Sequence, residues 1–177
     1  MDLSVDEYGL VSLDLNHMTR ELARIRDENW REKYTFAFLI LMQGPPTEDA
    51  WMDLKTGEAS SPDLLNLKKL AHHRAMPLVN SDRNAFDSKI MVGRARNNDI
   101  ILRAPKISKL HAVFVPGDEG DYRLTDMGSR NGTIVNGRRL KRKEQAKLQS
   151  GDIISFWRFM FMYVTRDAML DRLKEIK

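Results

Sequence analysis

Short apolar segments separated by turn residues dominate the second half of this chain. They recur at intervals of roughly eight to twelve residues, with Gly, Asn and Asp between them. After Pro77 these segments are residues 89–92, 99–102, 111–115, 122–126, 133–136, 153–156 and 159–165. This spacing is typical of an antiparallel β-sandwich, in which neighbouring strands are joined by tight turns. The pair Asn136-Gly137 also predicts a hairpin turn.

The N-terminal part of the chain has a different pattern. Between Ser12 and Tyr34 apolar side chains recur every three or four positions, which predicts one amphipathic helix of about five turns. The apolar run 36–42 predicts a buried strand, and residues 50–54 predict a second short strand beside it. A Ser-Pro-Asp sequence typical of a helix start predicts a helix over residues 62–74.

The C-terminal residues complete the predicted organisation. Residues 167–176 form an amphipathic pattern and are expected to be a capping helix. Because residues 159–162 are apolar on both faces of the predicted strand, we expect the N-terminal or the C-terminal helix to cover one face. The fold class is therefore mainly β: an α/β extension of unknown role over 1–75, a β-sandwich over 76–166 and a short helix over 167–177.

Charge is distributed unevenly along the 177 residues. The net charge of the whole chain is +4. Residues 1–75 carry 9 Lys and Arg against 13 Asp and Glu, a net charge of −4, whereas residues 76–177 carry 20 against 12, a net charge of +8. The sandwich part is therefore the basic one, which indicates an anionic ligand there.

Composition excludes several classes of site and location. The chain has no cysteine, which rules out disulfides, thiol nucleophiles and cysteine-based zinc sites and is compatible with a reducing compartment. The longest apolar run, Phe36 to Met42, is far shorter than the roughly 20 residues that span a bilayer. The acidic start of the sequence does not look like a secretory signal. We therefore expect a cytoplasmic protein without a membrane partner.

Polar motifs lie in the connections between the predicted strands. Gly93-Arg94 follows the first strand, Ser108-x-x-His111 precedes the third, and Ser129-Arg130-Asn131-Gly132-Thr133 precedes the fifth. Asn136-Gly137 and Gly151-Asp152 follow. In this order and spacing the motifs resemble the forkhead-associated (FHA) domain, over residues 76–166. The compact chain is similar to the bacterial stand-alone type of this domain.

The resemblance implies an eleven-stranded β-sandwich whose end loops bind phosphothreonine peptides. It implies that Arg94 and Ser108 hold the phosphate and that Asn131 grips the peptide main chain. Chemistry agrees, because a phosphate of charge about −2 needs several donors and a fixed cation. Lys109 is a further candidate contact, as is Arg130, which stands where family members often have Thr or Ser.

Four motif residues are expected to be structural. The resemblance implies that His111 braces the binding loops and is neither a catalytic base nor a metal ligand. Gly93 is expected where two backbone segments approach closely, and Gly132 where φ is positive. Asn136 belongs to the predicted hairpin.

The expected function is that of a non-enzymatic adaptor in Ser/Thr kinase signalling, without cofactor or metal. Its partner would be a phosphothreonine-containing protein or peptide, with Ser/Thr kinases among the candidates. One alternative is nucleic-acid binding through the basic stretch 138–147, and another is a scaffold that binds proteins without phosphate. A weaker hypothesis is that Thr47, in an acidic context, is phosphorylated and occupies the protein's own site.

Overall fold

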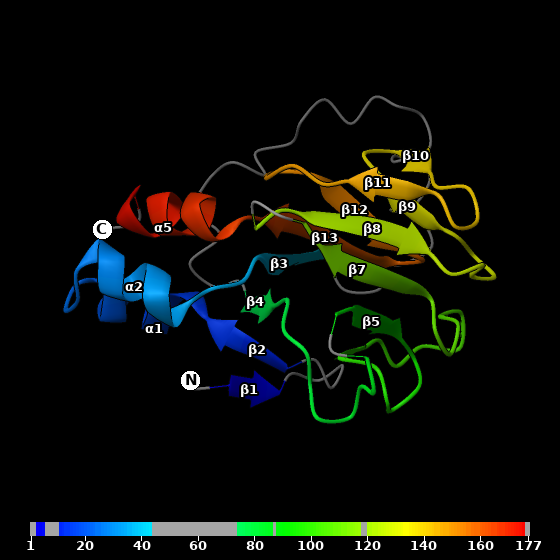
Figure 1. Ribbon diagram of the computed structural model, residues 1–177, viewed down its shortest axis with the longest axis horizontal. Coiled ribbons are helices and arrows are strands. Elements are labelled where there is room, and N and C mark those ends of the chain that lie inside the picture. The colour runs from blue at the N-terminus through cyan, green and yellow to red at the C-terminus, as the bar shows by residue number, and fades with distance from the viewer. Residues whose placement is uncertain (1–2, 6–10, 44–73, 87, 118–119, 176–177) are drawn as a thin grey trace.

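The computed structural model describes residues 3–5, 11–43, 74–86, 88–117 and 120–175 (Figure 1). These residues form two β-sheets and three helices. The eight-stranded sheet has the order β1-β2-β4-β3-β13-β12-β9-β10, and the five-stranded sheet has the order β11-β8-β7-β5-β6. Only the β5–β6 pair is parallel among the described strands. The mainly β fold class with a short C-terminal helix is thus confirmed.

The bounds of the elements follow the predicted segments closely in the C-terminal part. The larger sheet contains β1 (Leu3–Val5), β2 (Val11–Asp14), β3 (Phe38–Gln43), β4 (Arg74–Pro77), β9 (Thr133–Val135), β10 (Arg138–Arg139), β12 (Ile153–Phe156) and β13 (Phe159–Val164). The smaller sheet contains β5 (Ile90–Gly93), β6 (Ile100–Ile101), β7 (Ala112–Pro116), β8 (Tyr122–Asp126) and β11 (Gln145–Lys147). The helices are α1 (Leu15–Leu22), α2 (Asp27–Lys33) and α5 (Arg166–Glu175).

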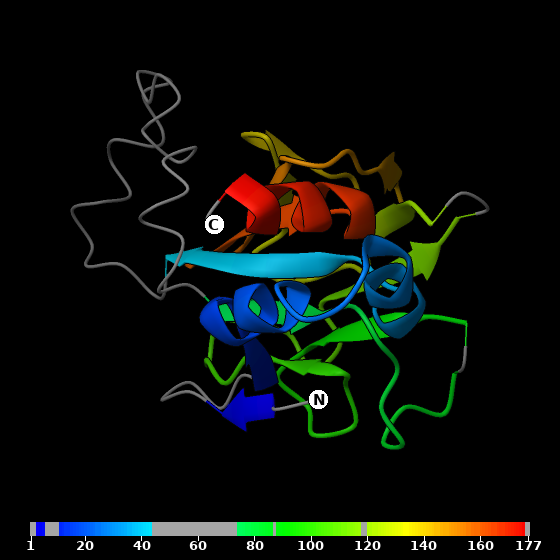
Figure 2. The ribbon, with the colours of Figure 1, turned by 90° about the vertical axis from the view of Figure 1, so that its left-hand side faces the viewer.

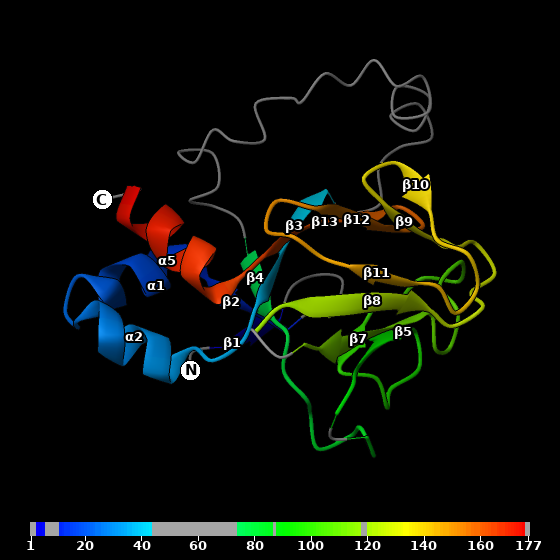
Figure 3. The same ribbon diagram turned by 45° about the horizontal axis from the view of Figure 1, so that its top comes forward.

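The two sheets pack face to face around one hydrophobic core (Figure 3). Leu39 of β3 and Phe161 of β13 meet Val92 of β5 and Phe114 of β7 in this core. All four side chains are fully buried. Because β3 lies between β4 and β13, the larger sheet combines strands from both sides of residue 75.

A second core lies on the outer face of the larger sheet. Phe38 of β3 and Met162 of β13 point away from the sandwich core and pack with Met18, Trp30 and Leu170 from the three helices. Figure 2 shows α1 and α5 in front of this sheet. Both helical segments therefore cover the apolar outer face, as the two-sided pattern of residues 159–162 predicts.

The prediction of one long helix between Ser12 and Tyr34 is wrong. The carboxylate of Asp14 accepts a hydrogen bond from the Asn16 amide at 2.9 Å and caps α1, so the residues before it are free to form β2. The helix stops after Leu22, and α2 begins at Asp27. In one straight helix Met18 and Trp30 would be about 18 Å apart along the axis. The break lets both side chains enter the same core.

Five short strands were not expected from the sequence: β1, β2, β4, β10 and β11. β4 lies at the end of the predicted helix 62–74 and pairs with β2 and β3. β10 and β11 are two and three residues long and mostly charged or polar, so they lack the apolar pattern of a strand. The predicted strand 50–54, residues 62–73 and Thr47 lie outside the described residues. The described strands number thirteen, against the eleven that the resemblance implies.

Candidate functional site

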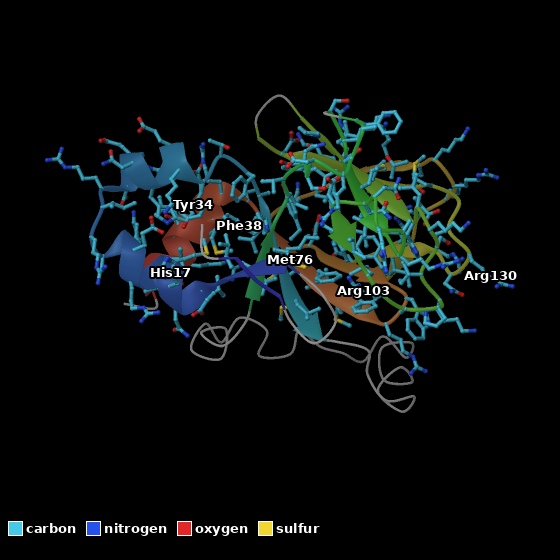
Figure 4. The ribbon with its side chains drawn as sticks, turned by 90° about the horizontal axis from the view of Figure 1, so that it is seen from below. His17, Tyr34, Phe38, Met76, Arg103 and Arg130 are labelled. Carbon is cyan, nitrogen blue, oxygen red and sulfur yellow. The ribbon has the colours of Figure 1, made fainter. Side chains whose placement is uncertain are left out.

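Three connections meet at the end of the sandwich opposite the helices. They are residues 93–98, 106–111 and 127–132, and together they are called the loop end here. Their strands place them together, because β5 and β8 finish at this end while β7 and β9 begin there. Figure 4 shows Arg130 at this extreme of the molecule and His17 and Tyr34 at the other.

Backbone hydrogen bonds hold the first two connections together. The amide of Arg94 donates to the carbonyl oxygen of Ser108 at 3.0 Å, and the amide of Ala95 donates to that of Lys109 at 3.2 Å. A Cβ atom on Gly93 would lie 2.3 Å from the Lys109 carbonyl oxygen. Only glycine permits this close approach, so Gly93 sets the distance between Arg94 and Ser108.

Ser108 connects the second and third segments. Its Oγ accepts a hydrogen bond from the backbone amide of Arg130 at 3.0 Å. Because a hydroxyl also carries one proton, Ser108 can still donate to an incoming oxygen atom. The half-buried hydroxyl is thus held in place while its donor remains available.

Three of the cationic residues on these loops are predicted phosphate ligands. Arg94, Lys109 and Arg130 are all exposed, and their side chains make no ion pair or hydrogen bond with the residues that the structure describes. Exposed cations without a carboxylate partner keep their full attraction for an added anion. The backbone contacts of Arg94, Ser108, Lys109 and Arg130 bring all four predicted phosphate ligands to one end of the sandwich.

Asn131 extends the same site toward residue 106. Its Nδ2 donates to the carbonyl oxygen of Lys106 at 2.6 Å, while its side chain remains partly exposed. A carboxamide has a second N–H and an acceptor oxygen, so Asn131 can still both donate to and accept from a peptide backbone. This is the chemistry that alignment of a bound peptide main chain requires.

His111 lies buried behind these loops and contacts two of them. Its Nδ1 accepts a hydrogen bond from the Ser108 amide at 3.3 Å, and its Nε2 lies 3.1 Å from the Gly132 carbonyl oxygen, to which it donates. Burial lowers the pKa of His111, and the Gly132 hydrogen bond and the Asp126 charge oppose that change. A buried neutral imidazole with both nitrogens occupied acts as a brace.

The third loop depends on a buried carboxylate that sequence reasoning missed. Asp126 accepts hydrogen bonds from the amides of Gly128 and Ser129 and from the hydroxyls of Ser129 and Thr133, at 2.6 to 2.9 Å. Burial raises the pKa of Asp126, but the hydrogen bonds from Ser129, Thr133 and the two amides outweigh it and leave the pKa below its ordinary value. The Asp-x-Gly-Ser sequence, typical of a side-chain-stabilised turn, was the available signal.

Asn98 is a second buried polar residue that anchors the loops. Its Nδ2 donates to the carbonyl oxygens of Ala95 and Lys109, both at 2.8 Å, and the side chain is almost fully buried. The residue therefore fixes the segment that follows Arg94 against the segment that follows Ser108. Its sequence, Asn-Asn-Asp, gave no indication of which asparagine is buried.

The remaining motif residues have local roles. Gly132 has φ +81°, a conformation that favours glycine. Asn136 lies at the other end of β9 and not at the loop end; its side chain donates to Asp152 and accepts from the Ile153 amide, both at 2.8 Å. Asn136 therefore joins the β9–β10 hairpin to the start of β12.

Two further features concern only the parts of the chain that the structure describes. Within them no group of three His, Cys, Asp or Glu side chains is placed to hold a metal ion. No helix among them is both long and apolar enough to cross a membrane.

Comparison with known proteins identifies similar sequences for this part of the chain. A sequence profile of the FHA domain matches residues 90–157. The DNA damage response protein kinase DUN1 of Saccharomyces cerevisiae is 39% identical over 86 residues, which are 44% of this chain and 17% of that kinase. The chain thus spans less than a fifth of that relative.

A second relative is matched over most of its length. The oxoglutarate dehydrogenase inhibitor of Corynebacterium efficiens is 31% identical over 119 residues, which are 64% of this chain and 81% of that protein. Among solved structures, an FHA domain from Chlamydia trachomatis is 20% identical with a TM-score of 0.45, and the match covers 72% of this chain and 96% of that one.

Proposed function

The chain belongs to the FHA domain family, and from this premise we propose that its loop end is a receptor for phosphothreonine peptides. The protein would act as an adaptor that joins a phosphorylated partner to other proteins in Ser/Thr kinase signalling. One observation carries the proposal. The Ser108 hydroxyl accepts a hydrogen bond from the Arg130 amide and lies on loops that backbone hydrogen bonds hold together. The same loops carry the exposed cations Arg94, Lys109 and Arg130, whose side chains have no partner among the described residues.

The proposed mechanism is charge-assisted capture of the phosphate. Arg94 offers a planar pair of N–H donors to two phosphate oxygens, and Ser108 donates its hydroxyl proton to a third. Lys109 and Arg130 add positive charge on either side. Asn131 then aligns the peptide main chain next to the phosphothreonine.

The buried polar residues support binding without touching the peptide. His111, Asn98 and Asp126 fix the three loops through hydrogen bonds to their backbones. Loops that are already ordered lose less conformational entropy when a ligand binds, which leaves more of the contact energy as affinity. The proposal therefore assigns these three residues to positioning.

The wider role is part of the same proposal. The FHA part is a binding module, and we propose that the chain has no enzymatic activity of its own and works in the cytoplasm. For the predicted division into a 1–75 extension, a 76–166 sandwich and a C-terminal helix, we propose that the extension is built into the sandwich, since β3 is one of its strands and Leu39 lies in its core. A Ser/Thr kinase, or a protein phosphorylated by one, is the proposed partner.

Ion pairs involve two of the six cations in residues 138–147, the stretch on which the alternative of nucleic-acid binding rests. Arg138 is paired with Glu144 at 2.7 Å, and Lys147 is paired with Asp121 at 2.9 Å. These carboxylates reduce the charge that the stretch offers to a polyanion. The phosphate-independent scaffold remains the rival that a binding experiment must exclude.

The test is a titration of the full chain with a degenerate phosphothreonine peptide library and its unphosphorylated counterpart. We expect selective binding of the phosphorylated library and a loss of at least about tenfold in Arg94→Ala and Ser108→Ala, because charged hydrogen bonds contribute about 1.5–3 kcal/mol. Arg123→Ala, which removes an exposed arginine from β8, is the matched control. Equal binding of both libraries would favour the scaffold.

A further inference from the structure

We propose that Arg139 and Arg142 form a second anion-binding subsite beside the phosphate site. The subsite would take an acidic group on the bound phosphothreonine peptide, either a carboxylate or a second phosphate. The inference rests on the proposed function and adds the class of peptide that the site prefers.

After the hairpin turn the chain returns along the third connection, residues 127–132. In the antiparallel pairing of β10 with β9, Arg139 lies opposite Ile134. The Leu140 amide donates to the Thr133 carbonyl oxygen at 2.9 Å, and the Lys143 amide donates to the Asp126 carbonyl oxygen at 3.0 Å. The buried side chain of Leu140 anchors the segment in the sandwich core. Figures 1 and 3 show β10 beside β9 at this edge of the sheet.

The two arginine side chains lie against two glycines of the third connection. A Cβ atom on Gly132 would lie 2.4 Å from Nε and 2.6 Å from Cζ of Arg139. A Cβ atom on Gly128 would lie 2.8 Å from Nε and 3.2 Å from Cζ of Arg142. The guanidinium groups therefore lie on the two glycines that bracket Ser129, Arg130 and Asn131, and the missing side chains give them room.

Neither arginine has a counter-ion among the described residues. Arg139 and Arg142 are exposed and make no ion pair or side-chain hydrogen bond with the described residues, whereas their neighbour Arg138 is paired with Glu144. The carboxylate of the same loop, Asp126, is buried and occupied by four donors from within the loop. The guanidinium groups of Arg139 and Arg142 can therefore both bind an added anion.

These observations define the ligand by its chemistry. A guanidinium fork fits a carboxylate or a phosphate through two parallel hydrogen bonds. A peptide held at Arg94 and Ser108 and aligned by Asn131 would pass next to Gly132, because Gly132 follows Asn131 in the chain, and Arg139 lies against Gly132. A second anion on that part of the peptide would meet Arg139 and Arg142.

The experiment uses phosphothreonine peptides with otherwise neutral residues, in which one glutamate or one phosphoserine is moved along both flanks. With the full chain, we expect at least one position to raise affinity roughly fivefold, as two exposed ion pairs of ordinary strength would. The glutamate and phosphoserine series distinguish a carboxylate from a second phosphate. The double variant Arg139→Gln, Arg142→Gln should lose this gain and still bind the neutral phosphothreonine peptide.

The matched control is Lys141→Gln with Lys143→Gln, which removes the same charge from the same segment. It should keep most of the gain. The inference is overturned if no position raises affinity, if the double arginine variant keeps the gain, or if the lysine variant loses as much. It is also overturned if the arginine variant loses affinity only for a DNA duplex. Failure of the neutral phosphothreonine peptide to bind would refute the proposed function instead.

Discussion

The two ends of the molecule differ in the kind of side chain that is buried there. At the helical end, formed by α1, α2 and α5, the outer face of the larger sheet is covered by apolar side chains such as Trp30, Met18 and Leu170. At the loop end, the connections are fixed by buried polar side chains, those of Asn98, His111 and Asp126. The exposed side chains there include five cations, Arg94, Arg96, Lys106, Lys109 and Arg130, beside Asn97, Leu110 and Met127.

The difference shows how one β-sandwich can be stabilised at one end and bind a ligand at the other. Apolar packing stabilises the helices on the sheet, and it offers no polar group for binding a ligand. Buried hydrogen bonds instead fix backbone positions and thereby the direction of exposed side chains. Variants at the helical end should therefore change stability alone, whereas variants at the loop end should change stability and binding together.

The largest expected effect lies at the helical end. Trp30 is fully buried, and its ring lies 4.6 Å from that of Tyr34. Trp30→Ala should lower the free energy of unfolding by about 3–5 kcal/mol, as loss of a buried aromatic does. Urea denaturation measures this. Trp30→Phe is the control and should lose less, because the indole N–H has no hydrogen-bond partner in the described structure.

The comparison predicts that neither Trp30 variant changes phosphopeptide affinity under conditions where the protein is folded. A large loss of affinity in folded Trp30→Phe would show that the two ends are coupled.

A smaller effect on stability is expected at the loop end, together with an effect on binding. Asn98→Ala removes two hydrogen bonds and leaves the carbonyl groups of Ala95 and Lys109 without their buried donor. We expect a loss of about 2 kcal/mol in unfolding free energy. Because both carbonyls belong to the phosphate loops, peptide affinity should fall as well. The exposed neighbour Asn97 provides the control Asn97→Ala, which should change neither quantity.

The smallest expected effect is a dependence of stability on pH. Burial lowers the pKa of His111 below its ordinary value of 6.5, so the unfolded chain takes up a proton at a higher pH than the folded one. The stability that neutral His111 allows is present above pH 6.5 and is lost as pH falls from 6.5 toward the folded pKa.

Urea denaturation between pH 7.5 and 5.5 measures this dependence. We expect His111→Ala to flatten it, because this variant removes the buried imidazole. An unchanged pH dependence in His111→Ala would contradict the assignment of His111 as a buried neutral brace.

The sequence predicted the candidate ligand-binding residues of the loop end, but it did not predict the buried residues that hold the loops in place. Arg94, Ser108 and Asn131 stand in short motifs whose residue types indicate phosphate and peptide binding. Asn98 and Asp126 are important because they are buried, and burial is a property of the tertiary structure that single polar residues in loops do not reveal.

The fold was predicted best where the periodicity is local. The strands of the sandwich and α5 follow from apolar patterns over a few residues. The division of the predicted long helix into β2, α1 and α2 depends on packing against β3 and β13, which overrides local propensity. The contact of Arg139 with Gly132 likewise depends on the pairing of distant segments.

The account is tested most directly by following the backbone amides of the ¹⁵N-labelled full chain during titration with a phosphothreonine peptide. It predicts that the changed signals belong to Arg94, Ser108, Lys109, Arg130 and Asn131 and their neighbours, while those of α1, α2 and α5 stay in place. Changes concentrated in the helices, or the same changes with the unphosphorylated peptide, would contradict it.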